Sequence, residues 1–145
     1  MKLLHTTAAA LFVACLACAP LHAESSLPAS DNKAEWNRLT EMFAECSAVY
    51  NIAATFKETS AKGGIPYREL ANDALIAGMY SSQMLGLSDS HLESIYSDKF
   101  GIWEAAARDK TKSANILAKA EQCVADSLAT QNKLLDKLRE NTSNK

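Results

Sequence analysis

Apolar residues recur every three or four positions along most of the chain, which is the spacing of one side of an α-helix. The first such stretch begins at Asn32, whose side chain can accept a hydrogen bond from the backbone N–H of Glu35. Its apolar face consists of Trp36, Leu39, Phe43, Cys46, Tyr50 and Ala53. Because glycine is favoured just past a helix end, Gly63 and Gly64 predict that this helix ends by Lys62.

A second helix is predicted after Pro66, which fits in a first helical turn because its missing N–H is not needed there. One face is formed by Tyr67, Leu70, Ala74, Ala77, Ser81 and Leu85, and it is broadened by Leu75, Ile76 and Met79. Gly86 is the expected end of this helix. Gly78 lies in its interior, and either it permits close approach of another helix or it is simply a tolerated glycine.

The third predicted helix starts within residues 88–90, where Ser90 and Glu93 match a Ser-x-x-Glu capping box. Its apolar face is Leu92, Tyr96, Phe100, Trp103 and Ala107. Gly101 is a candidate position for a kink or a shortened helix. The polar residues 109–113 contain no strong helix breaker, so the third and fourth helices are either separate or continuous.

The last helix is predicted from Ser113 to Asn141. Its apolar face contains Ile116, Ala120, Cys123, Ser127, Thr130 and Leu134, with Leu117, Val124, Leu128, Leu135 and Leu138 alongside. No stretch shows the alternating pattern of a strand. The predicted fold is therefore an all-α domain over 32–141, a small antiparallel bundle of about four helices with the first and last as neighbours, followed by a short tail at 142–145.

The first 23 residues have the layout of a secretory signal peptide, and cleavage is expected after Ala23. Lys2 precedes an apolar run from Ala8 to Cys18, which is too short to be a permanent membrane anchor. A buried N-terminal helix is the alternative interpretation. Residues 24–31 then form a flexible leader. Lipidation at Cys15 or Cys18 is a second export route, although the residues before each cysteine match a lipoprotein signal poorly.

Two cysteines, Cys46 and Cys123, remain after removal of the signal peptide. An even pair in an exported chain predicts a disulfide, here between the first and last helices, and both cysteines lie on the apolar faces. Two free buried thiols are the alternative. Closing a loop of this length stabilises a fold by about 4.5 kcal/mol in the chain-entropy model. We therefore expect a structural disulfide in a periplasmic or secreted protein.

The charge of the expected mature chain is mildly negative, with 14 basic and 17 acidic side chains. Nucleic-acid binding requires clustered Lys and Arg, so a nucleic-acid partner is not expected. An anionic membrane surface is also a poor partner for such a chain, and membrane attachment is expected only if the protein is lipidated.

No pattern of catalytic, cofactor-binding or metal-binding residues is present in the expected mature chain. Its one histidine, His91, lies at a predicted helix start and is interpreted as solvated. Zinc, covalent haem and phosphate-loop motifs are lacking. The carboxylate pairs Glu41/Glu45 and Glu69/Asp73 are each one helical turn apart, a spacing typical of a solvated helix face.

The leading functional hypothesis is a non-catalytic module that binds another protein, as an inhibitor, an immunity factor or an envelope adaptor. Tyr80 lies off the main apolar face of the second helix and is the candidate contact residue. The first alternative is a carrier of a small apolar ligand in a pocket lined by Phe43, Tyr50, Tyr96 or Trp103. The second alternative is an enzyme that uses carboxylates alone.

Overall fold

The computed structural model describes residues 27–56, 59–109 and 111–143. Within these residues the protein contains four helices and no strand, which confirms the all-α prediction. The helices are α1 (Lys33–Ala53), α2 (Tyr67–Met84), α3 (Asp89–Ala107) and α4 (Ser113–Ser143). The predicted signal peptide and the lipidation candidates Cys15 and Cys18 lie outside the described residues.

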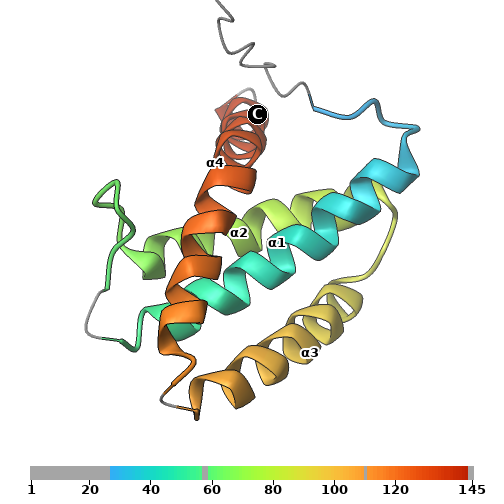
Figure 1. Ribbon diagram of the computed structural model, residues 1–145. Helices are drawn as coiled ribbons and strands as arrows, with labels where there is room; N and C mark the ends of the chain where they lie inside the picture. Colours follow the sequence, from blue (N-terminus) through green and yellow to red (C-terminus); the bar gives the residue numbers. More distant parts are fainter. Residues whose placement is uncertain (1–26, 57–58, 110, 144–145) are drawn as a thin grey trace, which may run out of the picture.

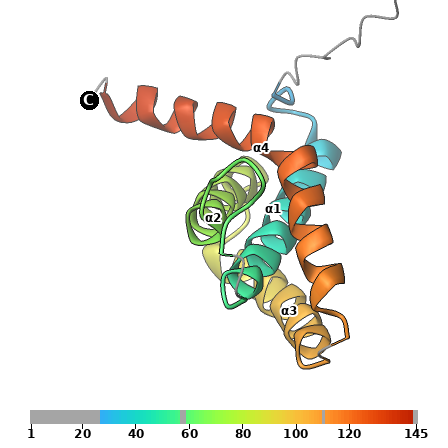
Figure 2. The ribbon, with the colours of Figure 1, turned by 60° about the vertical axis from the view of Figure 1, so that its left-hand side comes forward.

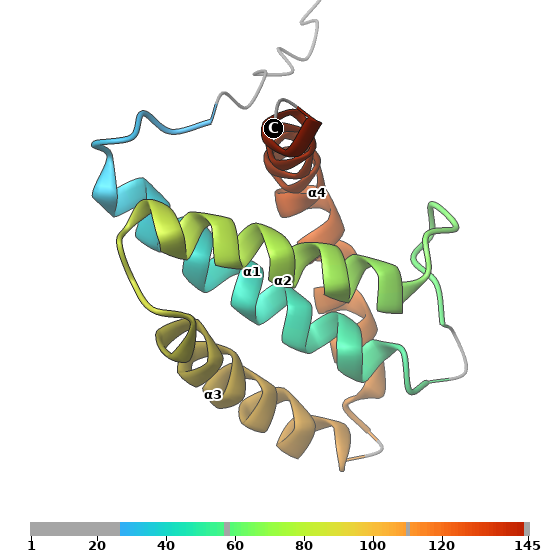
Figure 3. The ribbon, with the colours of Figure 1, turned by 180° about the vertical axis from the view of Figure 1, so that it is seen from behind.

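Helix α1 is the centre of the molecule (Figure 1). Helix α2 runs in the opposite direction along one side of α1, and α3 packs along another edge, parallel to α1. The first half of α4 crosses α1 on the face opposite α2, as the view from behind also shows (Figure 3). Because three elements surround α1, twelve of its 21 residues are buried.

The start of α1 agrees with the sequence. The Asn32 side chain accepts a hydrogen bond from the Glu35 backbone N–H at 3.2 Å. The residues before it are tied to the core, because the Trp36 indole N–H donates to the carbonyl oxygen of Ala29 at 2.9 Å. The helix ends at Ala53, well before the Lys62 limit. At this end the Thr55 hydroxyl donates to the Ile52 carbonyl at 2.7 Å and competes with helical hydrogen bonding.

The predicted disulfide is present between Cys46 of α1 and Cys123 of α4. The two Cα atoms are 5.6 Å apart, and both side chains are buried in the apolar core. The helical periodicity that placed both sulfurs on core-facing positions therefore predicted the covalent link between the first and last helices.

Gly78 lies where α2 is closest to its neighbours. A Cβ atom at this position would lie 3.4 Å from the Phe43 Cβ atom of α1 and 3.5 Å from a methyl carbon of Leu92 of α3. Of the two interpretations of Gly78, the structure therefore supports close helix approach. Gly86 has a φ of +71°, a left-handed conformation that ends α2.

Helix α3 starts within the predicted residues 88–90, at Asp89 after an N-cap at Ser88. The predicted capping box of Ser90 and Glu93 is wrong, because Ser90 already lies inside the helix; its hydroxyl and that of Ser88 hydrogen-bond to each other at 2.9 Å. The helix also continues through Gly101 to Ala107 without being shortened. It ends there, so α3 and α4 are separate helices.

Helix α4 bends sharply near its middle (Figure 2). Near the middle of Ser113–Ser143 in sequence, the Ser127 hydroxyl donates to the Cys123 carbonyl one turn earlier at 2.6 Å, a contact that commonly bends helices. The bend turns the second half of α4 away from α1 and over α2, so that Leu134 and Leu135 are buried. The bundle thus departs from four straight antiparallel helices. The helix extends to Ser143, two residues beyond its predicted end.

Candidate protein-binding surface

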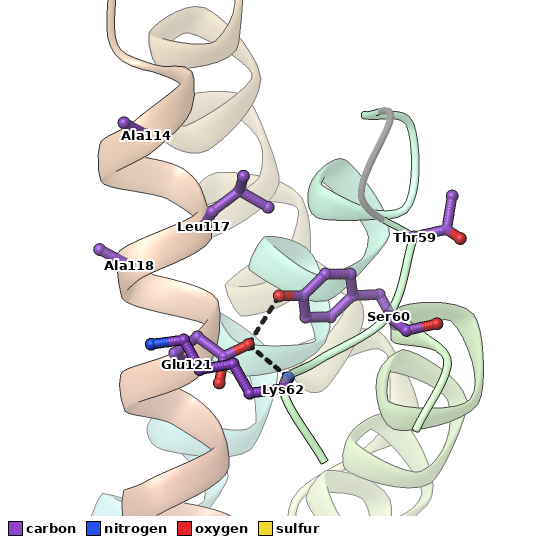
Figure 4. Close-up of a pocket in the computed structure, with 8 residues that line it drawn as sticks. Thr59, Ser60, Lys62, Ala114, Leu117, Ala118 and Glu121 are labelled. Atoms are coloured by element: carbon purple, nitrogen blue, oxygen red, sulfur yellow. Dashed lines mark hydrogen bonds between the residues drawn. The ribbon is translucent and has the colours of Figure 1, made fainter. Parts of the chain in front are cut away.

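A cleft lies between the 59–67 segment and the first half of α4 (Figure 4). Its volume is about 750 Å³. The segment turns back on itself through a bridge between Ser60 and Pro66, and Gly64 supplies the left-handed turn with a φ of +81°. The remaining lining is mostly small or polar: Thr59, Lys62, Tyr67, Ala114, Leu117, Ala118 and Glu121.

The Glu121 carboxylate holds the two walls of this cleft together. One oxygen of Glu121 accepts hydrogen bonds from the Tyr67 hydroxyl and from the Lys62 backbone N–H, both at 3.0 Å (Figure 4). The Tyr67 ring stacks on Tyr50, with centroids 6.1 Å apart. Glu121 therefore anchors the 59–67 segment to α4.

A second concave region lies on the outward side of α2. One groove of about 360 Å³ runs between α2 and α3 and is lined by Leu75, Met79, Asp89, Leu92, Glu93 and Tyr96. On the other side, hollows of about 290 and 210 Å³ lie between α2 and the end of α4; they include Ile76, Tyr80 and Leu138. Met79 lines the first groove and the last hollow, so the two sides meet at its side chain.

We call the outward residues Leu75, Ile76, Met79, Tyr80 and Gln83 the α2 face. Met79 is 36% exposed, one of two large apolar side chains described as exposed. The rim is polar, with the carboxylates Asp89 and Glu93 on the α3 side and Asp73 with Arg139 on the α4 side. An apolar centre with a charged rim is the usual composition of a protein-binding surface.

Tyr80, the predicted contact residue, lies at the edge of the α2 face. Its side chain is half-buried, and its ring packs against Trp36 at a centroid distance of 6.0 Å. The residue that the sequence interpretation missed is Met79, which was assigned to the broadened core face of the second helix. The sequence contains one indication of this exposure. Leu75, Ile76 and Met79 make the apolar face of the second helix wider than a single neighbouring helix can cover.

The four aromatic candidates for a ligand pocket do not share a cavity among those described above. Phe43 and Tyr50 are fully buried in the core. Tyr96 lines the groove between α2 and α3, whereas Trp103 is half-buried with the Lys119 ammonium 6.0 Å from its ring centroid. Burial raises the pKa of Tyr50 to about 12, against the opposing effect of its contact with the Ser127 side chain.

The carboxylates considered for catalysis are dispersed. Glu41 faces Lys99 of α3 at 3.4 Å, and Glu45 faces Lys119 of α4 at 3.5 Å. Asp73 lines the hollow beside the end of α4, and Glu69 is exposed in the first turn of α2. His91 is exposed on the first turn of α3, as expected.

Three findings bear on the class of protein. In the part of the chain that the structure describes, no cluster of three His, Cys, Asp or Glu side chains could hold a metal ion. No helix within the same residues is long and apolar enough to cross a membrane. The disulfide indicates an oxidising compartment outside the cytoplasm, where such bonds form and persist.

Comparisons with protein-family models, with curated proteins and with solved structures find no match to this chain.

Proposed function

We propose that the protein is an exported, non-catalytic module that binds another protein through the α2 face. The observation that carries this proposal is the exposed Met79 side chain at the junction of two concave regions. Apolar side chains of a partner can enter the hollows on either side of Met79. In protein interfaces, a few side chains buried in such hollows provide most of the binding energy.

The scaffold suits this role. Helix α2, which presents the face, packs against the buried side of α1, and α1 is joined to α4 by the disulfide. A surface held in place before binding loses little conformational entropy when a partner docks, which favours affinity. An inhibitor, an immunity factor or an envelope adaptor is a protein of this kind.

The groove on the α3 side defines the chemistry of the partner. Its floor is apolar, and the Asp89 and Glu93 carboxylates flank it. A partner segment that inserts Leu, Ile or Met and carries an adjacent Lys or Arg would fit this groove, because each basic group would face a carboxylate. The proposal that the protein is exported depends on the expected signal peptide at 1–23, cleaved after Ala23. The partner is then expected in the periplasm or outside the cell.

The test is site-specific photo-crosslinking in the cell of origin. A benzophenone side chain at Met79 should give one defined covalent adduct, whereas the same group at Gln122, which is exposed on the first half of α4 on the far side of α1 from α2, should not. Mass spectrometry then identifies the partner. In the purified pair, Met79→Asp should weaken binding by roughly tenfold or more, while Gln122→Asp should leave it unchanged. The absence of a position-specific adduct, or equal binding by both variants, contradicts the proposal.

A second candidate, a carrier of a small apolar molecule, is favoured by the groove beside Tyr96. Native mass spectrometry of the protein purified from its own cells should then show a retained ligand of defined mass. Leu75→Trp, which fills the groove, should abolish that retention. A spectrum with only the mass of the polypeptide counts against this candidate and leaves the protein-binding proposal in place.

A further inference from the structure

Helix α3 is held to the rest of the protein by little buried surface. Of its 19 residues only Leu92 is buried, whereas eight of the 18 residues of α2 are buried. Its other large apolar side chains are partly or largely exposed: Ile95, Tyr96, Phe100, Ile102 and Trp103. Because apolar burial supplies most of the free energy that holds a helix in place, α3 is the least firmly packed of the four helices.

The polar contacts between α3 and α1 do not replace the missing burial. The Asn51 amide donates to the Tyr96 hydroxyl at 3.0 Å, and the Lys99 ammonium lies 3.4 Å from the Glu41 carboxylate. The Lys99 and Glu41 side chains are 32% and 45% exposed, and ion pairs that water reaches contribute little to stability. Helix α3 contains no cysteine, so the disulfide between α1 and α4 does not tie it down.

The one buried anchor of α3 lies near its first turn. A Cβ atom at Gly78 of α2 would lie 3.5 Å from a methyl carbon of Leu92 and 3.4 Å from the Phe43 Cβ atom of α1. Leu92 therefore covers the place where Gly78 lets α2 come close to α1. If Leu92 were withdrawn, this place would be open to another apolar side chain.

Helix α3 also supplies one wall of the groove between α2 and α3. Two of the lining residues, Leu75 and Met79, belong to α2, and the other four belong to α3: Asp89, Leu92, Glu93 and Tyr96. The α2 wall is firmly held, because α2 packs along α1 and buries eight residues. The groove thus has one wall that is firmly held and one that is weakly held.

We propose that α3 is a movable wall of this groove, which opens as a unit while α1, α2 and α4 stay folded and closes again over a side chain that has entered beside Met79. Proteins open locally in such units at a lower free energy than they unfold globally, and the least packed element opens most easily. With Leu92 withdrawn from Gly78, the groove deepens and admits apolar side chains of different shapes. The role of this movement in binding rests on the function proposed above, whereas the opening itself is a property of the free protein.

Native-state hydrogen exchange of the oxidised, unbound protein tests the opening. After correction for intrinsic rates, backbone amides in the second half of α3 should exchange roughly 100-fold or more faster than those in the centre of α1. Low concentrations of urea should accelerate exchange in α1, because it requires unfolding of the whole core, and should change exchange in α3 much less. Equal rates with equal urea dependence in the two helices overturn the proposal.

A matched pair of leucine truncations separates local opening from global unfolding. Leu134 is fully buried on the second half of α4, which turns away from α3 (Figure 2). Leu134→Ala should accelerate exchange in α1 by roughly thirtyfold or more and leave α3 unchanged, because the contacts of Leu134 persist while α3 is open. Leu92→Ala should accelerate both helices by the same factor, because its contacts are lost in either event.

A Leu134→Ala variant that accelerates both helices equally also overturns the movable wall, since α3 would then exchange only through global unfolding. Circular dichroism checks the fold of both variants, and the wild-type rates test the proposal even where a variant does not fold. The result is separate from the Met79 crosslinking. Fast exchange of α3 without an adduct at Met79 would support the opening and contradict the partner site, whereas an adduct with uniform exchange would show a rigid groove and contradict the opening.

Discussion

Helices α1 and α3 are of similar length, with 21 and 19 residues, and both show apolar side chains at helical spacing. Their environments are nevertheless opposite. Twelve residues of α1 are buried, whereas α3 buries only Leu92. The same pattern therefore gives a central helix in one case and an attached outer helix in the other.

The difference teaches that periodicity identifies which side of a helix faces inward but not how many neighbours cover it. Helix α1 is enclosed by α2, α3 and α4 (Figures 1 and 2). Helix α3 rests mainly on α1 and is fixed by polar contacts at its margin, including the Asn51 amide donating to the Tyr96 hydroxyl at 3.0 Å. We infer that α1 contributes most of the stability and that α3 is free to serve as an interaction surface.

The largest expected effect comes from truncating equivalent aromatic residues on the two helices. Phe43 of α1 is fully buried, and Phe43→Ala should lower the free energy of unfolding by about 3–5 kcal/mol. Phe100 of α3 is half-buried, and Phe100→Ala should cost only about 1 kcal/mol. Urea denaturation followed by circular dichroism measures both. Equal losses would break the distinction between the helices.

The disulfide should give the next largest effect, because it ties α1 but not α3 to the rest of the chain. The double variant Cys46→Ala/Cys123→Ala should lose about 2–4 kcal/mol, since its unfolded state is no longer restrained by the loop of 77 residues. Wild-type protein unfolded in the presence of a reductant should show the same loss. Alkylation of the native oxidised protein at either cysteine would show that the link is not formed.

The free energy of unfolding, measured as a function of pH above 9, distinguishes the contribution of Tyr50 of α1 from that of Tyr96 of α3. The pKa of Tyr50 is raised by burial from 10.0 to about 12, so between these values the unfolded chain releases the proton while the folded chain retains it. Stability is therefore complete below about pH 10 and should fall by about 2–3 kcal/mol as the pH rises toward 12. Tyr50→Phe should remove this decrease.

The matched variant on α3 is Tyr96→Phe. Burial also raises the pKa of Tyr96, but this side chain is only half-buried whereas Tyr50 is fully buried, so removal of the Tyr96 hydroxyl should change the alkaline decrease much less. At pH 7, Tyr50→Phe should cost no more than about 1 kcal/mol, because its hydroxyl gives up the contact with the Ser127 side chain. An unchanged alkaline decrease in Tyr50→Phe would contradict the assignment to this residue.

The smallest effects are expected from alanine substitutions at two glycines inside helices. Gly101 of α3 has open space where a Cβ atom would lie, so Gly101→Ala should stabilise the protein by about 0.5–1 kcal/mol through helix propensity. Gly78→Ala should be close to neutral, because its Cβ atom would press on Phe43 and Leu92. The larger Gly78→Val should cost about 1–3 kcal/mol by overpacking. Thermal unfolding of the three variants measures this order, and a stabilising Gly78→Val would show that α2 is not closely packed there.

The sequence by itself determined the helical fold class, the disulfide and most helix limits. These features depend on local rules: apolar spacing of three or four residues, Asn32 as an N-cap, Gly86 as a stop, and two cysteines on core-facing positions. The capping box at Ser90 failed although its pattern was correct. Ser88, two residues earlier, already provides the N-cap, and a sequence motif alone does not choose between neighbouring start points.

Only the tertiary structure decided how much of each apolar face is covered. The bend of α4 near Ser127 carries Leu134 and Leu135 over α2, and the position of α3 beside α1 leaves Met79 and Ile102 exposed. Burial depends on the neighbours that a residue meets in space, whereas periodicity depends on its neighbours along the chain. The candidate surfaces on α2 and α3 therefore became visible only after the helices had been placed against one another.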